Sequence, residues 1–159
     1  MTSPSIIRLL VCLALCLGVG FASGSVTYPE IPTSYASLIK ASWTPPNRAF
    51  PLVWSVLYTM MGFSLWLLWD RGINAAVTRT AIILFIVQLV LNAAWSPIFF
   101  ALHQTRVALA IIVLMAIAIA ATIVAACPSR RVAAWLLVPY LAWVVYATSL
   151  NAAIVALNF

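Results

Sequence analysis

The chain has 159 residues, of which 66% are hydrophobic and only 6% are charged. Soluble domains carry about 25% charged residues, so this composition excludes an ordinary soluble protein. The formal net charge is +6, but the basic residues are scattered through the connections, and no basic run of the nucleic-acid-binding type occurs. We therefore expect an all-α integral membrane protein with no nucleic-acid partner.

Five apolar segments follow one another along the chain. Four of them carry no formal charge and reach the roughly 20 residues that a helix needs to cross a hydrocarbon core of about 30 Å. These are residues 49–69, 80–102, 107–127 and 132–159, preceded by a shorter segment at 9–25. We predict one membrane domain over residues 1–159, with helices at 6–26, 49–70, 77–102, 105–127 and 131–157.

The first segment has a second interpretation. Arg8, the apolar run 9–21 and the small residues at 22–25 also fit a signal peptide with its cleavage region. The resemblance described below favours a retained helix. Gly20 and Gly24 have the Gly-x-x-x-Gly spacing that lets membrane helices approach closely, which favours self-association, although glycine is also simply common in such helices.

Residues 26–49 form the longest predicted connection. Its prolines, together with Pro51, fix φ and supply no backbone donor, so the next helix is expected to begin near Phe50. A connection of this length with several aromatic residues, among them Trp43, favours a functional lid over a disordered segment. The remaining connections are short, which predicts an up-and-down bundle of antiparallel neighbours.

The basic residues give a preferred orientation. The bias of Lys and Arg toward the cytoplasm favours an inward N-terminus. The division is five against three: Arg8, Arg71, Arg79, Arg130 and Arg131 on one side, and Lys40, Arg48 and Arg106 on the other.

Three helices each carry aromatic and polar residues on one face. In residues 49–70, Trp54 and Tyr58 stand at i and i+4. Amides are costly to expose to lipid, so the faces that carry them should look into the bundle. These faces contain Gln88, Asn92, Trp95 and Phe99 in the third segment, where Pro97 predicts a kink, and Pro139, Trp143, Ala147 and Asn151 in the fifth.

Together these faces predict an interior cavity beneath a lid that carries Trp43. Its walls would be flat and aromatic with a few amide and phenol groups, which suits a flat, mostly apolar ligand with polar edges. The alternative is that Asn92 and Asn151 hydrogen-bond between helices while the tryptophans pack the core or lie in interfacial belts.

Catalytic and metal-binding residues are scarce. Glu30 and Asp70 are the only carboxylates, and both lie in connections, so no carboxylate pair is expected. His103 lies at a helix end, where capping is the expected role rather than haem ligation. The three cysteines lack metal-like spacing. We expect no metal site and no required cofactor.

At these residues the chain resembles the TspO/MBR family of bacterial tryptophan-rich sensory proteins and mitochondrial translocator proteins. The resemblance covers nearly the whole chain and rests on three blocks in order. They are Trp43-x-Pro45-Pro46 with Phe50-Pro51-x-x-Trp54-x-x-Leu57-Tyr58, Asn92-x-x-Trp95-Ser96-x-Ile98-Phe99-Phe100, and Pro139-Tyr140-x-x-Trp143 with Thr148-x-Leu150-Asn151.

The resemblance implies a five-helix bundle, often a homodimer, whose cavity binds porphyrin-type tetrapyrroles such as protoporphyrin and haem. The implied role is sensing or transport of this ligand in a bacterial cell envelope. The family's ligand-binding positions fall on Trp43, Trp54, Tyr58, Asn92, Trp95, Trp143, Ala147 and Asn151. Light-dependent porphyrin degradation is the enzymatic alternative, with Trp54 and Trp143 as participants. A structural membrane partner protein that acts through the Gly20 and Gly24 face is the third.

Two departures from the family pattern bear on the ligand. The family's Lys-Pro-x-Trp is Lys40-Ala41-Ser42-Trp43 here, which predicts a looser loop. No basic residue follows Tyr146, so the cholesterol-recognition pattern of animal members is missing. A sterol is therefore a less favoured partner than a tetrapyrrole, whose propionates Arg48 or Lys40 would pair with.

Overall fold

The computed structural model describes residues 3–73 and 75–159, and every regular element in these ranges is helical. Within them, five helices are long and apolar enough to cross a membrane. These are α1 (Ser3–Thr27), α3 (Ala49–Arg71), α4 (Ala76–Ser96), α5 (Thr105–Ala126) and α6 (Arg131–Asn158). The prediction of an all-α, multi-pass membrane fold with five long helices is confirmed.

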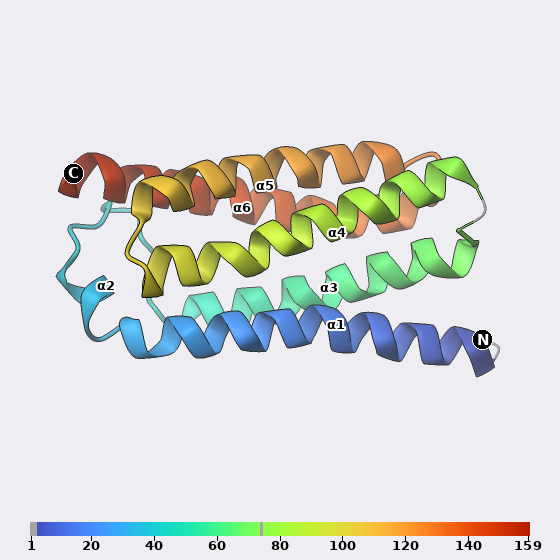
Figure 1. Ribbon diagram of the computed structural model, residues 1–159, viewed down its shortest axis with the longest axis horizontal. Coiled ribbons are helices and arrows are strands. Elements are labelled where there is room, and N and C mark those ends of the chain that lie inside the picture. Colours follow the sequence, from blue (N-terminus) through green and yellow to red (C-terminus); the bar gives the residue numbers. More distant parts are fainter. Residues whose placement is uncertain (1–2, 74) are drawn as a thin grey trace.

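The five long helices run up and down as one elongated bundle (Figure 1). Following the most extensive contacts, α1 packs on α3, α3 on α6, α6 on α5, α5 on α4, and α4 back on α1. The helices α3 and α4 touch each other less, although only a short turn joins them. The C-terminus and the connection between α1 and α3 lie at one end of the bundle, and the N-terminus lies at the other.

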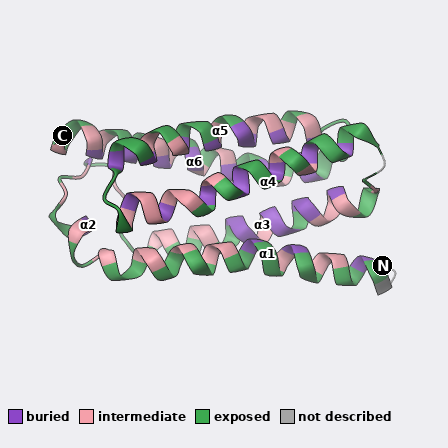
Figure 2. Cartoon of the chain, in the orientation of Figure 1, coloured by how far each residue is buried: buried purple, intermediate pink, exposed green. Residues whose placement is uncertain are grey.

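The core lies along the inward faces of all five helices (Figure 2). Its largest fully buried side chains include Tyr140, Phe85 and Met61. Cys12 and Cys16 of α1 also belong to this core. One face of α1 is therefore buried against the rest of the bundle. The outward faces carry exposed apolar side chains, as expected of helices that contact lipid rather than water.

The connection between α1 and α3 is partly helical, with the turns η1 (Tyr28–Glu30) and α2 (Ser34–Ser37). It is fastened to α6. Ile39 donates its N–H to Asn158 Oδ1 and accepts a bond from Asn158 Nδ2, both at 2.9 Å. His103, in the short link that precedes α5, places its Nε2 3.4 Å from Glu30 Oε2. The role of this segment as a lid stays a prediction.

The helix type changes at Pro97, the residue at which the sequence predicts a kink after α4. Pro97 lacks an N–H and interrupts the α-helical ladder, and the chain continues as one π-helical turn, η2 (Pro97–Ala101). This turn closes with a bond of 2.9 Å from the Leu102 N–H to the Pro97 carbonyl. It brings Phe99 and Phe100 to the loop end of the bundle, beside Tyr35 of α2.

Candidate functional site

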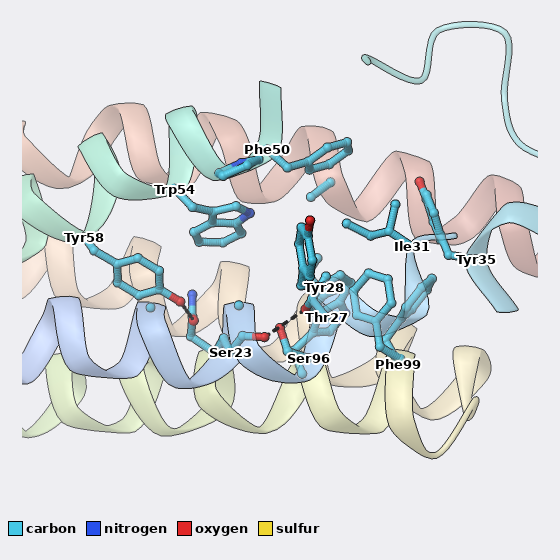
Figure 3. Close-up of a pocket in the computed structure, with 18 of the residues that line it drawn as sticks. Ser23, Thr27, Tyr28, Ile31, Tyr35, Phe50, Trp54, Tyr58, Ser96 and Phe99 are labelled. Carbon is cyan, nitrogen blue, oxygen red and sulfur yellow. Dashed lines mark hydrogen bonds between the residues drawn. The ribbon is translucent and has the colours of Figure 1, made fainter. Parts of the chain in front are cut away.

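A cavity of about 380 Å³ lies inside the loop end of the bundle. This volume falls within the range of roughly 300–1,000 Å³ that small-molecule sites occupy. All five long helices contribute to its wall, together with η2 and the connection that follows α1. In Figure 3, Trp54 and Tyr58 extend from α3, Ser23 and Thr27 from α1, and Phe99 from η2.

Six of the eight residues predicted for ligand binding line this cavity: Trp54, Tyr58, Asn92, Trp95, Ala147 and Asn151. They come from α3, α4 and α6, the three helices on which the sequence placed them. The structure therefore brings these side chains together around one space. Ligand binding by them stays a prediction.

The other two predicted residues lie outside the cavity wall. Trp43 is 55% exposed, and its carbonyl accepts a bond of 2.7 Å from the Tyr146 hydroxyl. Trp143 packs edge-on against Phe50, a wall residue, with ring centroids 5.9 Å apart. Its buried Nε1 has no hydrogen-bond partner among the described residues. Neither tryptophan is among the residues that line the cavity.

A chain of buried hydrogen bonds forms the inner end of the cavity. The Tyr58 hydroxyl donates to Asn92 Oδ1, and Asn92 Nδ2 donates to the Tyr140 hydroxyl at 2.9 Å. The Tyr140 hydroxyl in turn donates to Gln88 Oε1 at 2.9 Å. The chain links α3, α4 and α6, so it fixes the positions of Tyr58 and Asn92 at the cavity surface. Gln88 Nε2 is left without a partner among the described residues.

A second amide joins helices at the opposite side of the wall. Asn151 Oδ1 accepts a bond of 3.3 Å from Trp95 Nε1, and Asn151 Nδ2 donates to the Thr105 carbonyl at 3.0 Å. Asn92 and Asn151 therefore make the interhelical bonds that the alternative interpretation of the sequence proposed. They also line the cavity, and an amide oxygen that accepts one bond keeps a second lone pair for a ligand.

Aromatic rings form two flat parts of the wall. Trp54 lies against Tyr58 with centroids 5.5 Å apart, and its other neighbour is Tyr140, at 6.2 Å. Trp95 and Phe99 stack at 5.1 Å with an interplanar angle of 25°. Flat aromatic surfaces favour a flat ligand, because stacking maximises the apolar contact area.

The described wall of the cavity contains no Asp, Glu, Lys, Arg or His. At the loop end, burial raises the pKa of Tyr35 above its ordinary value, so this phenol is neutral at physiological pH. No group of three or more His, Cys, Asp or Glu residues lies close enough to hold a metal within residues 3–73 and 75–159. The wall offers stacking and neutral hydrogen bonds.

Sequence reasoning missed two parts of the wall. One is α1, which contributes Gly20, Ser23 and Thr27, and the other is α5, which contributes Ile112 and Met115. The spacing of Gly20 and Gly24 in α1 predicts a surface for self-association. In the structure, Gly20 packs against Tyr58 of the same chain. Apart from Thr105, Arg106 and Thr122, the helix α5 is apolar throughout, so its sequence gives no signal for a cavity-facing side.

These features define a multi-pass membrane protein with an uncharged, aromatic cavity at one end of a five-helix bundle. The model of the TspO/MBR family matches residues 12–157. The chain belongs to the TspO/MBR family.

Relatives from distant organisms cover most of the chain. A tryptophan-rich protein TspO of Chlorobaculum tepidum is 40% identical over 98% of this chain and 99% of its own length. The human translocator protein is 42% identical over 74% of this chain and 70% of its own. A tryptophan-rich sensory protein of Cereibacter sphaeroides is 33% identical over 92% of this chain and 89% of its own.

Proposed function

We propose that the protein is a membrane receptor or sensor that holds a porphyrin-type tetrapyrrole, protoporphyrin or haem, in the cavity and aids its transport. The observation that carries this proposal is the uncharged, aromatic cavity of about 380 Å³ inside the bundle. Relatives named "Translocator protein" and "Tryptophan-rich sensory protein" support a role in translocation or sensing.

The wall residues have distinct roles in this proposal. The macrocycle stacks on Trp54 and on the Trp95 ring, while Tyr58, Asn92 and Asn151 contact its polar edges. Trp143 acts indirectly by supporting Phe50, and Trp43 acts through the connection that covers the loop end.

The setting of the protein follows from the same reasoning. We propose a bacterial cell envelope as its location, with the N-terminus inside, and a homodimer as its assembly state. The helix α6 carries no basic residue after Tyr146, so a sterol remains the less favoured ligand.

Filling the cavity tests the proposal directly. Ala147 is buried and lines the cavity, so Ala147→Phe places a ring where the ligand would lie. Ala152 is an exposed residue of the same helix outside the wall, which makes Ala152→Phe the matched control. The measurement is the shift of the protoporphyrin IX Soret band in the dark on titration with the purified protein.

We expect saturable binding for the unmodified chain and the Ala152→Phe control, and a loss of affinity of tenfold or more in Ala147→Phe, about 1.4 kcal/mol. Equal affinities in all three proteins, or no saturable binding at all, would contradict the proposal. The second result would instead favour a structural partner protein that acts through the Gly20 and Gly24 face of α1, on which Gly24 has open space around it.

A light-dependent enzyme is the second candidate. Trp54 lies in the cavity wall and contacts Tyr58 and Tyr140, so electron-donating rings adjoin the indole that would stack on a porphyrin. In this alternative, dioxygen oxidises the illuminated porphyrin and the protein provides the site. The Trp54 variant described below separates the two candidates.

A further inference from the structure

The seam between α1 and α3 is closed in its inner half. A Cβ placed on Gly62 of α3 would lie 2.8 Å from Leu13 Cδ2 of α1. Nearer the loop end, a Cβ on Gly20 of α1 would lie 2.5 Å from Cδ2 of Tyr58 on α3. Distances below 3.0 Å do not occur between real Cβ atoms and their neighbours, so only glycine allows this approach. The two helices are in tight contact up to Gly20.

One turn further along α1, the seam is open. Gly24 lies on the same face as Gly20, because residues i and i+4 share a helix face. A Cβ on Gly24, in contrast, would meet nothing within 4 Å, although Gly24 lines the cavity. On the facing helix, the wall residues Pro51 and Ser55 are both exposed. The cavity therefore opens sideways between these residues.

We call this opening the α1–α3 gap and define it by Phe21 and Gly24 of α1 and by Pro51 and Ser55 of α3. Phe21 lines the cavity and is 81% exposed. By contrast, the wall residues contributed by α4, α5 and α6 are almost all buried, for example Asn92, Met115 and Asn151 at 4%, 1% and 1% exposure. The side walls on those helices are closed.

The α1–α3 gap faces the hydrocarbon layer. Gly24 precedes Glu30 by six residues and Ser55 follows Arg48 by seven, so the gap reaches about 9–11 Å below the charged residues that flank the two helices. The exposed neighbours on the outward side of α3 are Leu52 and Val56, both apolar. An apolar surface at this depth belongs in contact with lipid.

The hydroxyl groups around the gap are satisfied within their own helices. Ser55 donates to the Pro51 carbonyl at 2.7 Å, and Ser25 donates to the Phe21 carbonyl at 2.9 Å. Such bonds to the preceding turn leave no free donor toward lipid. The rim of the gap is therefore effectively apolar, in spite of its serines.

The water-facing end of the cavity is held more firmly. There the connection is bound to α6 through the two Ile39 bonds of Asn158 and through the Tyr146 bond to the Trp43 carbonyl. Displacing the connection from that side requires these bonds to open, although the wall residues Tyr28 and Asn47 are themselves exposed there. Entry through the α1–α3 gap requires no protein bond to break.

We propose that the α1–α3 gap is a lateral portal through which a flat, apolar ligand dissolved in the bilayer enters and leaves the cavity. This inference rests on the proposed function of the cavity as a binding site for such a ligand. It adds the route, and it makes the ligand's concentration in the membrane, rather than in water, the quantity that the protein responds to.

The test blocks the portal from each wall in turn. Gly24→Trp and Ser55→Trp place an indole in the gap, while Gly18→Trp and Val56→Trp place it on exposed positions of the same helices outside the cavity wall. The proteins are reconstituted in phosphatidylcholine vesicles. Stopped-flow mixing with protoporphyrin IX, followed by tryptophan quenching, gives the association and dissociation rate constants.

A blocked portal slows both directions and leaves the equilibrium unchanged. We expect both rate constants to fall about tenfold in Gly24→Trp and Ser55→Trp, with a much smaller change in Kd than in either rate constant, and neither rate constant to change in the two controls. Unchanged rates in both portal variants would overturn the portal. A loss of affinity without slower dissociation would also overturn it, because the gap would then be part of the binding site itself.

A further variant examines the water-facing route. Asn158→Ala combined with Tyr146→Phe removes the bonds that fasten the connection. With lateral entry, this variant associates at the unmodified rate, whereas faster association would place entry at the connection and overturn the portal. If the unmodified protein does not bind protoporphyrin IX at all, both the proposed function and the portal are contradicted. Binding with unchanged rates in the portal variants contradicts the portal alone.

Discussion

Tyr58 occupies the space that the missing side chain of Gly20 leaves free. A Cβ on Gly20 would lie 2.5 and 2.7 Å from two carbons of the Tyr58 ring, so the ring can reach Asn92 only because residue 20 is glycine. We expect Gly20→Ala to displace the ring and to destabilise the fold by about 1–3 kcal/mol. Porphyrin affinity should fall with it. Thermal unfolding and the Soret titration measure the two effects.

The same helix supplies the controls. Gly18 and Gly24 have open space around them, so Gly18→Ala and Gly24→Ala should stabilise the helix slightly, by up to about 1 kcal/mol, because alanine is the better helix former. Tyr58→Phe removes the bond to Asn92 but keeps the ring. If Gly20→Ala weakens binding as much in the Tyr58→Phe background as alone, Gly20 does not act through the Tyr58 hydroxyl.

Asn92 is the shared partner of two phenols on different helices. We expect Asn92→Leu to destabilise the protein by about 1–3 kcal/mol, since the buried Tyr58 hydroxyl then loses the acceptor that the Asn92 amide provides. Adding Tyr58→Phe should recover part of this loss, because no buried donor is then left unpaired. Thermal unfolding of the three variants checks this order. A double variant less stable than Asn92→Leu would exclude the explanation.

Arg48 is the basic residue best placed for an acidic ligand group. It precedes α3 beside the wall residue Asn47 and makes no ion pair in the described part of the chain. We expect Arg48→Gln to weaken protoporphyrin IX binding about two- to fivefold, the size of an exposed ion pair, and to leave binding of its dimethyl ester unchanged.

Lys40 is the matched control, since its Nζ already bonds the carbonyls of Ala36 and Leu38 at 3.2 and 3.0 Å. Lys40→Gln should have the smaller effect. If Arg48→Gln weakens acid and ester equally, Arg48 does not pair with a propionate.

The position of Trp54 in the wall separates receptor from enzyme. If the protein is a receptor, the protoporphyrin absorption spectrum under illumination in air should be the same with Trp54→Phe as with the unmodified protein. An enzyme would produce a new absorption band that this variant lacks while it still binds porphyrin. Trp143→Phe is the comparison, because Trp143 contacts the wall residue Phe50 but not the cavity.

Much of this architecture can be read from the sequence because lipid restricts the options. The helices α3 to α6 are apolar runs between short polar turns, and the residues of α4 and α6 that carry amides point inward because lipid cannot satisfy them. The spacing of Trp54 and Tyr58, and of Asn92 and Trp95, therefore placed four wall residues on the correct side.

The remaining features depend on which helices become neighbours. Gly20 and Gly24 have the same spacing whether they meet a second copy of the chain or a tyrosine of the same chain, and only the packing of α1 on α3 decides between them. Trp143 shares a helix face with Ala147, yet it packs on the wall residue Phe50 of α3 and does not itself line the cavity. No periodicity within one segment contains that information.

The pairing of Ile39 with Asn158 also determines which part of the fold can form last. The two residues are 119 positions apart, and both the N–H and the carbonyl of Ile39 depend on the one side chain. During synthesis the connection between α1 and α3 emerges before α4, α5 and α6, and Ile39 cannot make these bonds until the end of α6 has formed. The bonds that hold the connection to α6 can therefore form only after α4, α5 and α6 have been made, so this end of the bundle is completed last.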